Sequence, residues 1–359
     1  MQSFSEQLRQ HQQRLAQALE TLGTLESIEP APLPAETLLQ IDSMTLRYYP
    51  SQKPSQKPSQ SANENIKSAR PLLICYALIN RPYILDLEPG RSLVRDLLDA
   101  GHSVYLIDWG YPKATDRYLG LDDYINDYLH TAVRATLKHA ESAQLDLLGV
   151  CQGGVFSLCY AALYPHHVEK LITLVTPVDT EVDNFTLAQM VREVNIEALV
   201  ATRGNIAGEL LNQLYASLKP LELGIAKQLS LAKNLTNKRA ARTFLRMEHW
   251  LNDSPDITGR SAIEFAEGFF KRNGLVNGTL KIGDREVDIG QIKQPVLNAY
   301  GSKDHLVPPA SAAALRDVLT STEAYTELEL NGGHIGAFIS SRTRSQLVKA
   351  INEFRHESS

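Results

Sequence analysis

The chain has 359 residues, and its 41 acidic and 36 basic side chains give a formal net charge of −5 at pH 7. Hydrophobic residues make up 43% of the sequence and charged residues 21%, which excludes a mainly disordered or collagen-like chain. The mild acidity argues against a nucleic-acid-binding module, because such modules carry basic patches. The length suffices for one large domain or two smaller ones with a sizeable buried core.

Cysteine is scarce, with only Cys75, Cys151 and Cys159 in the whole sequence. An odd, sparse set of cysteines does not form a disulfide framework, and no pair has the spacing of a structural zinc site, so we expect no metal. Three reduced thiols and an N-terminus without the apolar core of a signal peptide predict a cytoplasmic protein. No window approaches the ~18 apolar residues of a membrane-spanning helix, so no transmembrane segment is expected.

The N-terminal stretch 4–25 predicts an amphipathic helix. Seven positions recur at alternating spacings of four and three, which places them on one helix face, and all but His11 are apolar: Phe4, Leu8, His11, Leu15, Ala18, Leu22 and Leu25. Such a helix either packs on its own domain or docks on a partner chain, and the sequence leaves both interpretations open. We assign residues 1–40 to this helix and a linker.

Residues 50–69 differ sharply in composition from the rest of the chain. The tetrapeptide SQKP occurs twice in tandem, and Pro, Ser, Gln and Lys dominate. This composition cannot form a core, so it predicts a mobile surface insertion between two strands, without chemistry of its own.

From residue 71 onward, short apolar runs alternate with helical stretches. The runs predicted as strands are 71–77, 103–108, 145–150, 170–177 and 295–301. Strands that are apolar almost throughout are buried on both faces, which indicates a mostly parallel sheet in an α/β protein. Between these strands, acidic residues at Asp122–Asp123 predict a helix N-terminus.

The most informative motif is Gly149-Val150-Cys151-Gln152-Gly153-Gly154, which lies between an apolar strand and a helical run. It is the nucleophile-elbow pattern of α/β hydrolases with Cys in place of Ser. The apex residue of an elbow sits in a strained turn, where side chains on the flanking glycines would clash. The helix N-terminus favours a thiolate at Cys151, and the backbone N–H of Gln152 is placed to donate to an oxyanion.

Two further residues complete the expected order of nucleophile, acid and histidine. Asp304 follows the predicted strand 295–301, and His334 lies in a glycine-flanked loop after the strand-like run 325–330. The adjacent His305 is a weaker candidate for the base, because its side chain should point away from that of Asp304. Asp108 could contact the site or serve a structural turn. We assign Cys75 and Cys159 to the core.

The loop 77–83 supplies the second oxyanion donor in this architecture. We expect a backbone N–H of Ile79 or Asn80 to fill that role. The pattern as a whole predicts an α/β-hydrolase fold, with a mostly parallel central sheet in two core parts, 41–179 and 295–359. The intervening stretch 180–294 lacks the strand rhythm and is too long for a loop, so it predicts an inserted helical cap.

A cysteine as nucleophile indicates which kind of acyl transfer the site favours. When it attacks a thioester, the acyl group remains a thioester, so a later transfer to a hydroxyl group is still downhill. Cysteine therefore suits an acyltransferase that takes an acyl group from a thioester and gives it to an alcohol. A helical cap over the site would exclude water and suppress hydrolysis.

Several segments together resemble the catalytic subunit of class III poly(3-hydroxyalkanoate) synthases. They are GVCQGG, ALINRPYILDL, LIDWGYP, WLNDSPD, GSKDHLVPP and GGHIG, and they span about residues 71–340. The resemblance implies polymerisation of (R)-3-hydroxyacyl-CoA, chiefly 3-hydroxybutyryl-CoA, with release of CoA and without a cofactor. It implies that Cys151 is the nucleophile that carries the acyl group, and that His334 deprotonates both Cys151 and the incoming 3-hydroxyl. Asp304 either orients His334 or itself assists the incoming hydroxyl.

The same resemblance implies a non-catalytic second synthase subunit as partner, a homodimer, and attachment to cytoplasmic polyester granules. Two other functions remain open from the residues alone. One is a Cys-dependent hydrolase or simple acyltransferase on the same fold, and the other is a catalytically silent granule-coat protein. The ordered triad argues against the silent protein.

Overall fold

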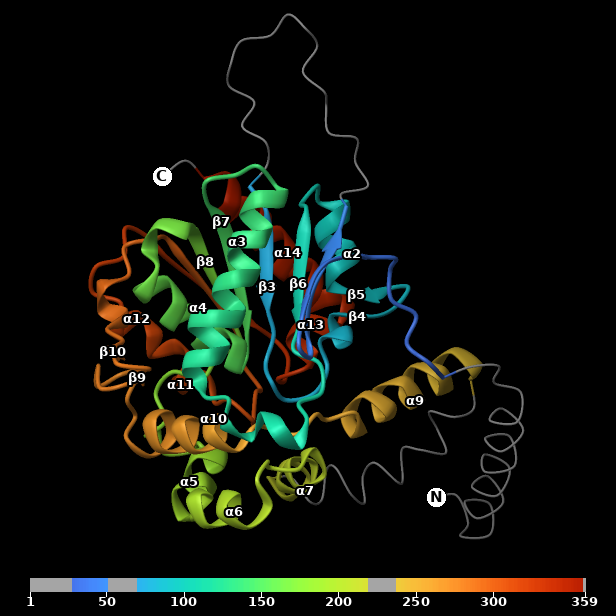
Figure 1. The fold of residues 1–359 in the computed structure, drawn as a ribbon. Helices are drawn as coiled ribbons and strands as arrows, with labels where there is room; N and C mark the ends of the chain where they lie inside the picture. Colours follow the sequence, from blue (N-terminus) through green and yellow to red (C-terminus); the bar gives the residue numbers. More distant parts are fainter. Residues whose placement is uncertain (1–27, 51–69, 219–236, 358–359) are drawn as a thin grey trace, which may run out of the picture.

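A computed structural model describes residues 28–50, 70–218 and 237–357 of the chain (Figure 1). The predicted N-terminal helix 4–25 and nearly all of the insertion 50–69 lie outside the described residues. Among the described helices, none combines the length and apolar character needed to cross a membrane.

An eight-stranded sheet forms the centre of the molecule. Its spatial order is β1 (Glu36–Ile41), β2 (Met44–Tyr49), β6 (Val104–Asp108), β3 (Leu72–Cys75), β7 (Leu145–Val150), β8 (Val168–Leu174), β11 (Val296–Gly301) and β12 (Tyr325–Leu330). From β6 to β12 all neighbours are parallel, whereas β1 and β2 form an antiparallel hairpin that pairs with β6. The predicted α/β class and mostly parallel sheet are therefore confirmed.

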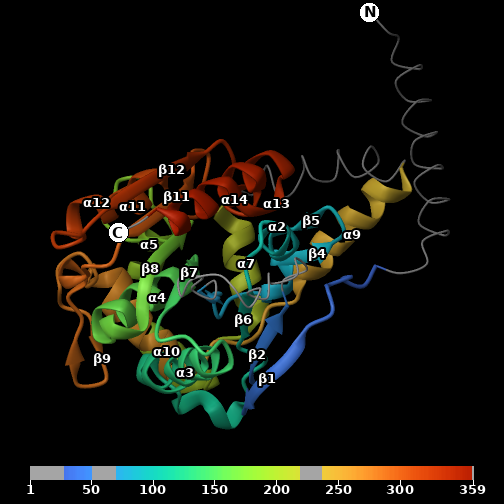
Figure 2. The same cartoon turned by 90° about the horizontal axis from the view of Figure 1, so that it is seen from above.

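Helices cover both faces of the sheet (Figures 1 and 2). One face carries α3 (His130–His139) and α4 (Gln152–Leu163), and the other carries α2 (Leu93–Asp99) and α14 (Ser341–His356). Each face has its own apolar cluster, because β3, β7 and β8 are buried on both sides and present alternate side chains to the two layers. This burial explains the apolar strand runs in the sequence.

The helix predicted from Asp122–Asp123 is present. It begins as a π-helical segment, Asp123–Leu129, and continues as α3. The boundary placed at residue 40 falls inside β1, so the sheet begins earlier than expected, at Glu36. The alternation of β1 is weak and its residues are partly exposed, which hid this edge strand from the sequence pattern.

The chain between β8 and β11 is mostly helical. It contains α5 (Thr186–Glu193), α6 (Ile196–Arg203), α7 (Gly208–Leu218), α9 (Lys238–Asn252), α10 (Gly259–Glu264) and a π-helical segment, Phe265–Lys271. It also contains a short hairpin, β9 (Lys281–Ile282) and β10 (Arg285–Glu286), that the helical pattern did not predict. In Figure 1, α5, α6, α7 and α10 lie together below the end of the sheet at which β7 meets α4.

The remaining elements connect these layers. They are the helical turn Pro82–Leu85, β4 (Asp86–Glu88), β5 (Arg91–Ser92), the turns Ala114–Tyr118, Pro165–His167 and Ile289–Gln291, α11 (Pro309–Ala313), α12 (Leu315–Val318) and α13 (Gly336–Ile339). Short α13 joins the loop of His334 to α14, which positions that loop at the carboxyl end of the sheet.

Candidate active site

Cys151 occupies the sharp turn between β7 and α4. Its backbone has φ 54° and ψ −123°, a conformation that side-chain-bearing residues rarely adopt. The turn is held by hydrogen bonds from the Cys151 N–H to the Leu174 carbonyl, 2.9 Å, and from the Gly154 N–H to the Cys151 carbonyl, 2.9 Å. Local strain fixed by the surrounding structure is characteristic of functional positions.

The glycines of the elbow are sterically required. A Cβ atom on Gly153 would lie 2.2 Å from the carbonyl oxygen of Cys75, and one on Gly154 would lie 1.8 Å from Oγ1 of Thr176. Neither distance is compatible with a side chain, so the helix and strand approach closely only because these residues are glycine. The steric reason predicted from the sequence is therefore present in the structure.

The predicted acid and base lie in contact. Nδ1 of His334 donates to Oδ2 of Asp304 at 2.6 Å, and only 1% of the Asp304 side chain and 11% of the His334 side chain are exposed. Asp304 is held in turn by the backbone N–H groups of Leu306 and Val307, at 2.9 and 3.0 Å from its Oδ1. These bonds orient the carboxylate and leave the other nitrogen of His334 for a second partner.

That second partner is Cys151. Burial lowers the pKa of His334, but the charges of Asp304 and Cys151 and hydrogen bonds to both raise it, with a net increase from 6.5 to about 10. The protonated imidazole is thus stabilised by the Asp304 carboxylate on one side and by Cys151 on the other. The geometry brings together all three residues that the sequence placed in catalytic roles.

Cys151 lies at the edge of an apolar cavity of about 130 Å³. Apart from Cys151, Gln152 and Tyr215, the lining is nonpolar and comes mainly from the segments between β8 and β11, including Phe185, Leu187, Ile206, Leu211, Leu214 and Ile257. A nonpolar lining of this kind offers few hydrogen-bond partners to water.

The loop after β3 faces the same cavity through Ile79, as does Gln152 of the elbow. The Gln152 side chain is buried, and its Oε1 accepts the backbone N–H of Leu78 at 3.1 Å. This bond ties the loop to the elbow, a role that the sequence did not reveal because its two ends are 74 positions apart.

Asn80, the other predicted oxyanion residue, has a different side-chain role. With φ 59° it adopts the left-handed conformation, and its Nδ2 donates to Ser254 Oγ at 2.6 Å and to the carbonyls of Trp250 and Leu251 at 3.4 Å. Trp250 Nε1 donates to the Arg81 carbonyl at 2.7 Å. The end of α9 therefore anchors the loop, and the sequence signal for this was only the short-range preference of Asn for φ > 0.

The other candidate residues have structural positions. Cys75 and Cys159 are fully buried, and burial raises the pKa of each thiol to about 12, so neither forms a thiolate near neutral pH. Asp108 accepts from Arg81 at 2.7 Å and from the Gly110 N–H at 3.1 Å, which places it in the turn and against the loop. Among the described residues, no group of three or more His, Cys, Asp or Glu side chains is arranged to hold a metal ion.

The sheet, the strained elbow and the Cys–His–Asp arrangement define an α/β-hydrolase-fold protein with a cysteine at the nucleophile position. The family described as "alpha/beta hydrolase fold" matches residues 70–340. The chain is 39% identical to the poly(3-hydroxyalkanoate) polymerase subunit PhaC of Thiocystis violacea and 40% identical to that of Allochromatium vinosum. Each comparison covers 99% of this chain and 97% of the relative.

The corresponding protein of Synechocystis sp. is 44% identical over 80% of this chain and 78% of its own length. The chain belongs to the poly(3-hydroxyalkanoate) polymerase family. It is an enzyme of polyhydroxyalkanoate biosynthesis that polymerises hydroxyalkanoates, built on the α/β-hydrolase fold.

Proposed function

We propose that the chain polymerises (R)-3-hydroxyacyl groups delivered as CoA thioesters, through a covalent thioester on Cys151 and without a cofactor. The observation that carries this proposal is the cysteine at the strained elbow, beside the His334–Asp304 pair and at the edge of an apolar cavity. A hydrolase on this fold would need water at the same place. The nonpolar lining therefore favours transfer to a hydroxyl over hydrolysis.

The first half-reaction follows from the position of each group. The Cys151 thiolate attacks the thioester carbonyl, and the resulting oxyanion accepts hydrogen bonds from the backbone N–H groups of Gln152 and Ile79. When the intermediate collapses, the bond to CoA breaks, and protonated His334 gives its proton to the CoA sulfur. The products are acyl-Cys151 and free CoA, and His334 is left neutral.

In the second half-reaction, neutral His334 accepts the proton of a 3-hydroxyl group as that oxygen attacks acyl-Cys151. The new ester bond forms, the bond to Sγ breaks, and the thiolate and protonated His334 are restored. Asp304 keeps the imidazole oriented and stabilises its positive charge in both steps. The contact between Asp304 and Nδ1 of His334 favours this role over direct action of Asp304 on the hydroxyl.

The cavity supports a short acyl group, and we assign 3-hydroxybutyryl-CoA as the chief substrate. The volume of the apolar cavity, about 130 Å³, is well below the roughly 300–1,000 Å³ of ordinary ligand sites. Comparing CoA release from 3-hydroxybutyryl-CoA with release from 3-hydroxyoctanoyl-CoA tests this assignment. A higher kcat/KM for the longer substrate would overturn it.

We also infer a multi-subunit enzyme that works at cytoplasmic polyester granules, as a homodimer with a non-catalytic second subunit. The relatives' own name, polymerase subunit, supports assembly with a further chain. Activity and polymer yield measured with and without the candidate second subunit, and sedimentation of each mixture, test this part of the proposal.

Substitution Cys151→Ala tests the mechanism. We expect CoA release from 3-hydroxybutyryl-CoA to fall at least about a thousandfold, because removal of a nucleophile eliminates the covalent path. Cys159→Ala provides the control, since its buried thiol lies outside the site. Undiminished CoA release by the Cys151 variant would refute the covalent mechanism. Monomeric 3-hydroxy acid as the only product of the unaltered enzyme would favour the Cys-dependent hydrolase instead.

A further inference from the structure

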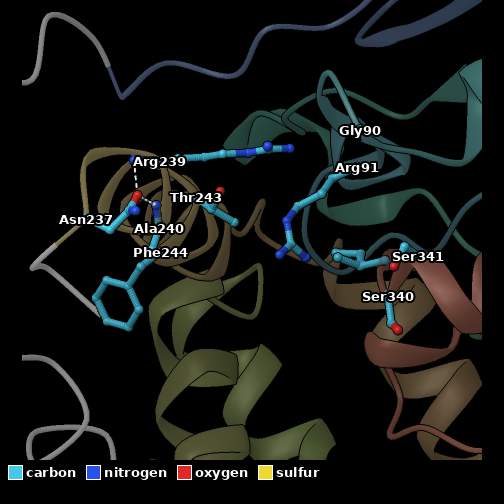
Figure 3. Close-up of a pocket in the computed structure, with 10 residues that line it drawn as sticks. Gly90, Arg91, Asn237, Arg239, Ala240, Thr243, Phe244, Ser340 and Ser341 are labelled. Atoms are coloured by element: carbon cyan, nitrogen blue, oxygen red, sulfur yellow. Dashed lines mark hydrogen bonds between the residues drawn. The ribbon is translucent and has the colours of Figure 1, made fainter. Parts of the chain in front are cut away.

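A second cavity, of about 730 Å³, lies between the start of α9, the β4–β5 turn and the junction of α13 with α14. Its lining includes Gly90, Arg91, Arg239, Thr243, Ser340 and Ser341 (Figure 3). We call it the arginine-lined pocket. Its volume is within the range of roughly 300–1,000 Å³ typical of small-molecule sites.

Two arginines of this pocket converge from different elements. In Figure 3 the Arg239 side chain extends from α9 toward the turn of Gly90, and the Arg91 guanidinium lies on the side of Thr243 and Ser341. The Arg239 guanidinium lies next to the turn at Gly90. A Cβ atom added to Gly90 would be only 3.5 Å from Nη2 of Arg239. Guanidinium groups bind phosphate oxygens in a bidentate manner.

Behind the pocket lie further charged groups, which are paired with one another. Glu88 pairs with Arg246 at 2.9 Å and with Nε of Arg91 at 3.5 Å, and Arg344 contacts Asp96 and donates to the Gly90 carbonyl at 3.0 Å. Among the described residues, these contacts set the four guanidinium groups of Arg91, Arg239, Arg246 and Arg344 against the two carboxylates of Glu88 and Asp96. The resulting net positive charge favours an anionic ligand.

Neutral donors complete this environment. Ser340 and Ser341 stand at the start of α14, a helix of 16 residues whose first N–H groups have no partner within the helix. Such a helix start adds partial positive charge at the pocket wall and supplies hydrogen-bond donors for phosphate oxygens. Three elements, β5, α9 and α14, thus contribute positive potential to one cavity.

The arginine-lined pocket is connected to the active site by two elements. α13, which ends at Ile339 beside the pocket, begins two residues after His334. α9 lines the pocket at Ala240 and contacts the Arg81 carbonyl through Trp250. The stretch of α9 from Ala240 to Trp250 spans about 15 Å along the helix axis. The pantetheine arm of CoA resembles about four residues of extended chain, which span roughly the same distance.

We propose that the arginine-lined pocket binds the phosphorylated nucleotide end of acyl-CoA while the pantetheine arm carries the thioester to Cys151. This inference rests on the proposed function, because it takes the acyl donor to be a CoA thioester. Arg91 and Arg239 hold the phosphates, and the start of α14 provides further donors. The pocket thereby recognises the carrier, while the apolar cavity recognises the acyl group.

The test is the double variant Arg91→Gln, Arg239→Gln, assayed with 3-hydroxybutyryl-CoA and with 3-hydroxybutyryl-pantetheine, which lacks the nucleotide. We expect KM for the CoA substrate to rise at least about tenfold, because charge-assisted contacts to phosphate are lost. We expect kcat for both substrates, and KM for the pantetheine substrate, to stay as in the unaltered enzyme. Equal thermal unfolding midpoints would show that the fold is intact.

Arg342→Gln is the matched control, because Arg342 is exposed on α14 and does not line the pocket. An unchanged KM for the CoA substrate in the double variant, an equal rise for both substrates, or an equal rise in the control would overturn the inference. Calorimetric titration with free CoA gives an independent readout, with weaker binding expected only in the double variant. The two proposals can fail separately. If the unaltered enzyme binds free CoA but produces no CoA from 3-hydroxybutyryl-CoA, the proposed function is refuted, whereas the assignment of the pocket to CoA stands.

Discussion

Nδ1 of His334 lies 2.6 Å from Oδ2 of Asp304, and this contact determines how the imidazole faces Cys151. Because Asp304 occupies one ring nitrogen, the other is left for the thiol. The pairing holds a positive charge next to a sulfur atom that the elbow has already placed at a helix N-terminus.

Substitution Asp304→Asn should lower kcat by about 10²–10⁴-fold, because the amide removes the negative charge and no longer fixes the tautomer of His334. The measurement is CoA release across pH 6–10. The neighbouring His305→Gln is the control and should retain activity, since the contact to Asp304 is made by His334. A larger loss in the His305 variant than in the Asp304 variant would contradict this assignment of the base.

The raised pKa of His334 makes stability depend on pH. The folded state holds the proton more tightly, with a pKa of about 10 against 6.5 for an unperturbed histidine. The resulting stabilisation is complete below pH 6.5 and is lost as pH rises toward 10. Thermal unfolding of the unaltered enzyme and of His334→Gln should therefore show a difference in Tm that shrinks between pH 6.5 and 10. A difference that widens over this range would have the wrong sign.

The packing of the elbow predicts a specific rescue. Gly154→Ala should destabilise the fold by about 1–3 kcal/mol, because its Cβ would overlap the Thr176 side chain. Adding Thr176→Ala removes the two nearest atoms, at 1.8 and 2.6 Å, and should restore part of the loss. Gly153→Ala meets backbone atoms instead and should not be rescued. The comparison is denaturant unfolding of Gly154→Ala and Gly153→Ala, each with and without Thr176→Ala. Equal rescue of both glycine variants by Thr176→Ala would exclude this steric account.

The anchor between Asn80 and the end of α9 should matter for catalysis. Asn80→Ala loses three hydrogen bonds and places alanine at φ 59°, whereas Asn80→Gly loses the same bonds but tolerates the backbone conformation. We expect kcat to fall in both variants, by about tenfold or more, because a displaced loop misplaces the oxyanion donor. Only the alanine variant should also lose stability through backbone strain. Full activity in the glycine variant would show that the amide has no positioning role.

Much of the fold and the candidate site followed from local patterns. The strand predicted at residues 145–150 coincides with β7, and the run 325–330 is β12. Buried parallel strands have to be apolar throughout, so their sequence is distinctive. The elbow is equally local, since six consecutive residues contain both the nucleophile and the glycines that its turn requires. The order of Cys151, Asp304 and His334 was visible for the same reason.

The tertiary structure alone decided which side chains meet. The bond between Gln152 and the Leu78 N–H joins positions 74 apart, and that between Asn80 and Ser254 joins positions 174 apart. The pairing of β2 with β6, the lining of the apolar cavity and the convergence of Arg91 with Arg239 also depend on packing between distant segments. Periodicity and local sterics are properties of neighbouring residues. Contacts between remote residues are set by how whole layers pack, and no short stretch of sequence contains that information.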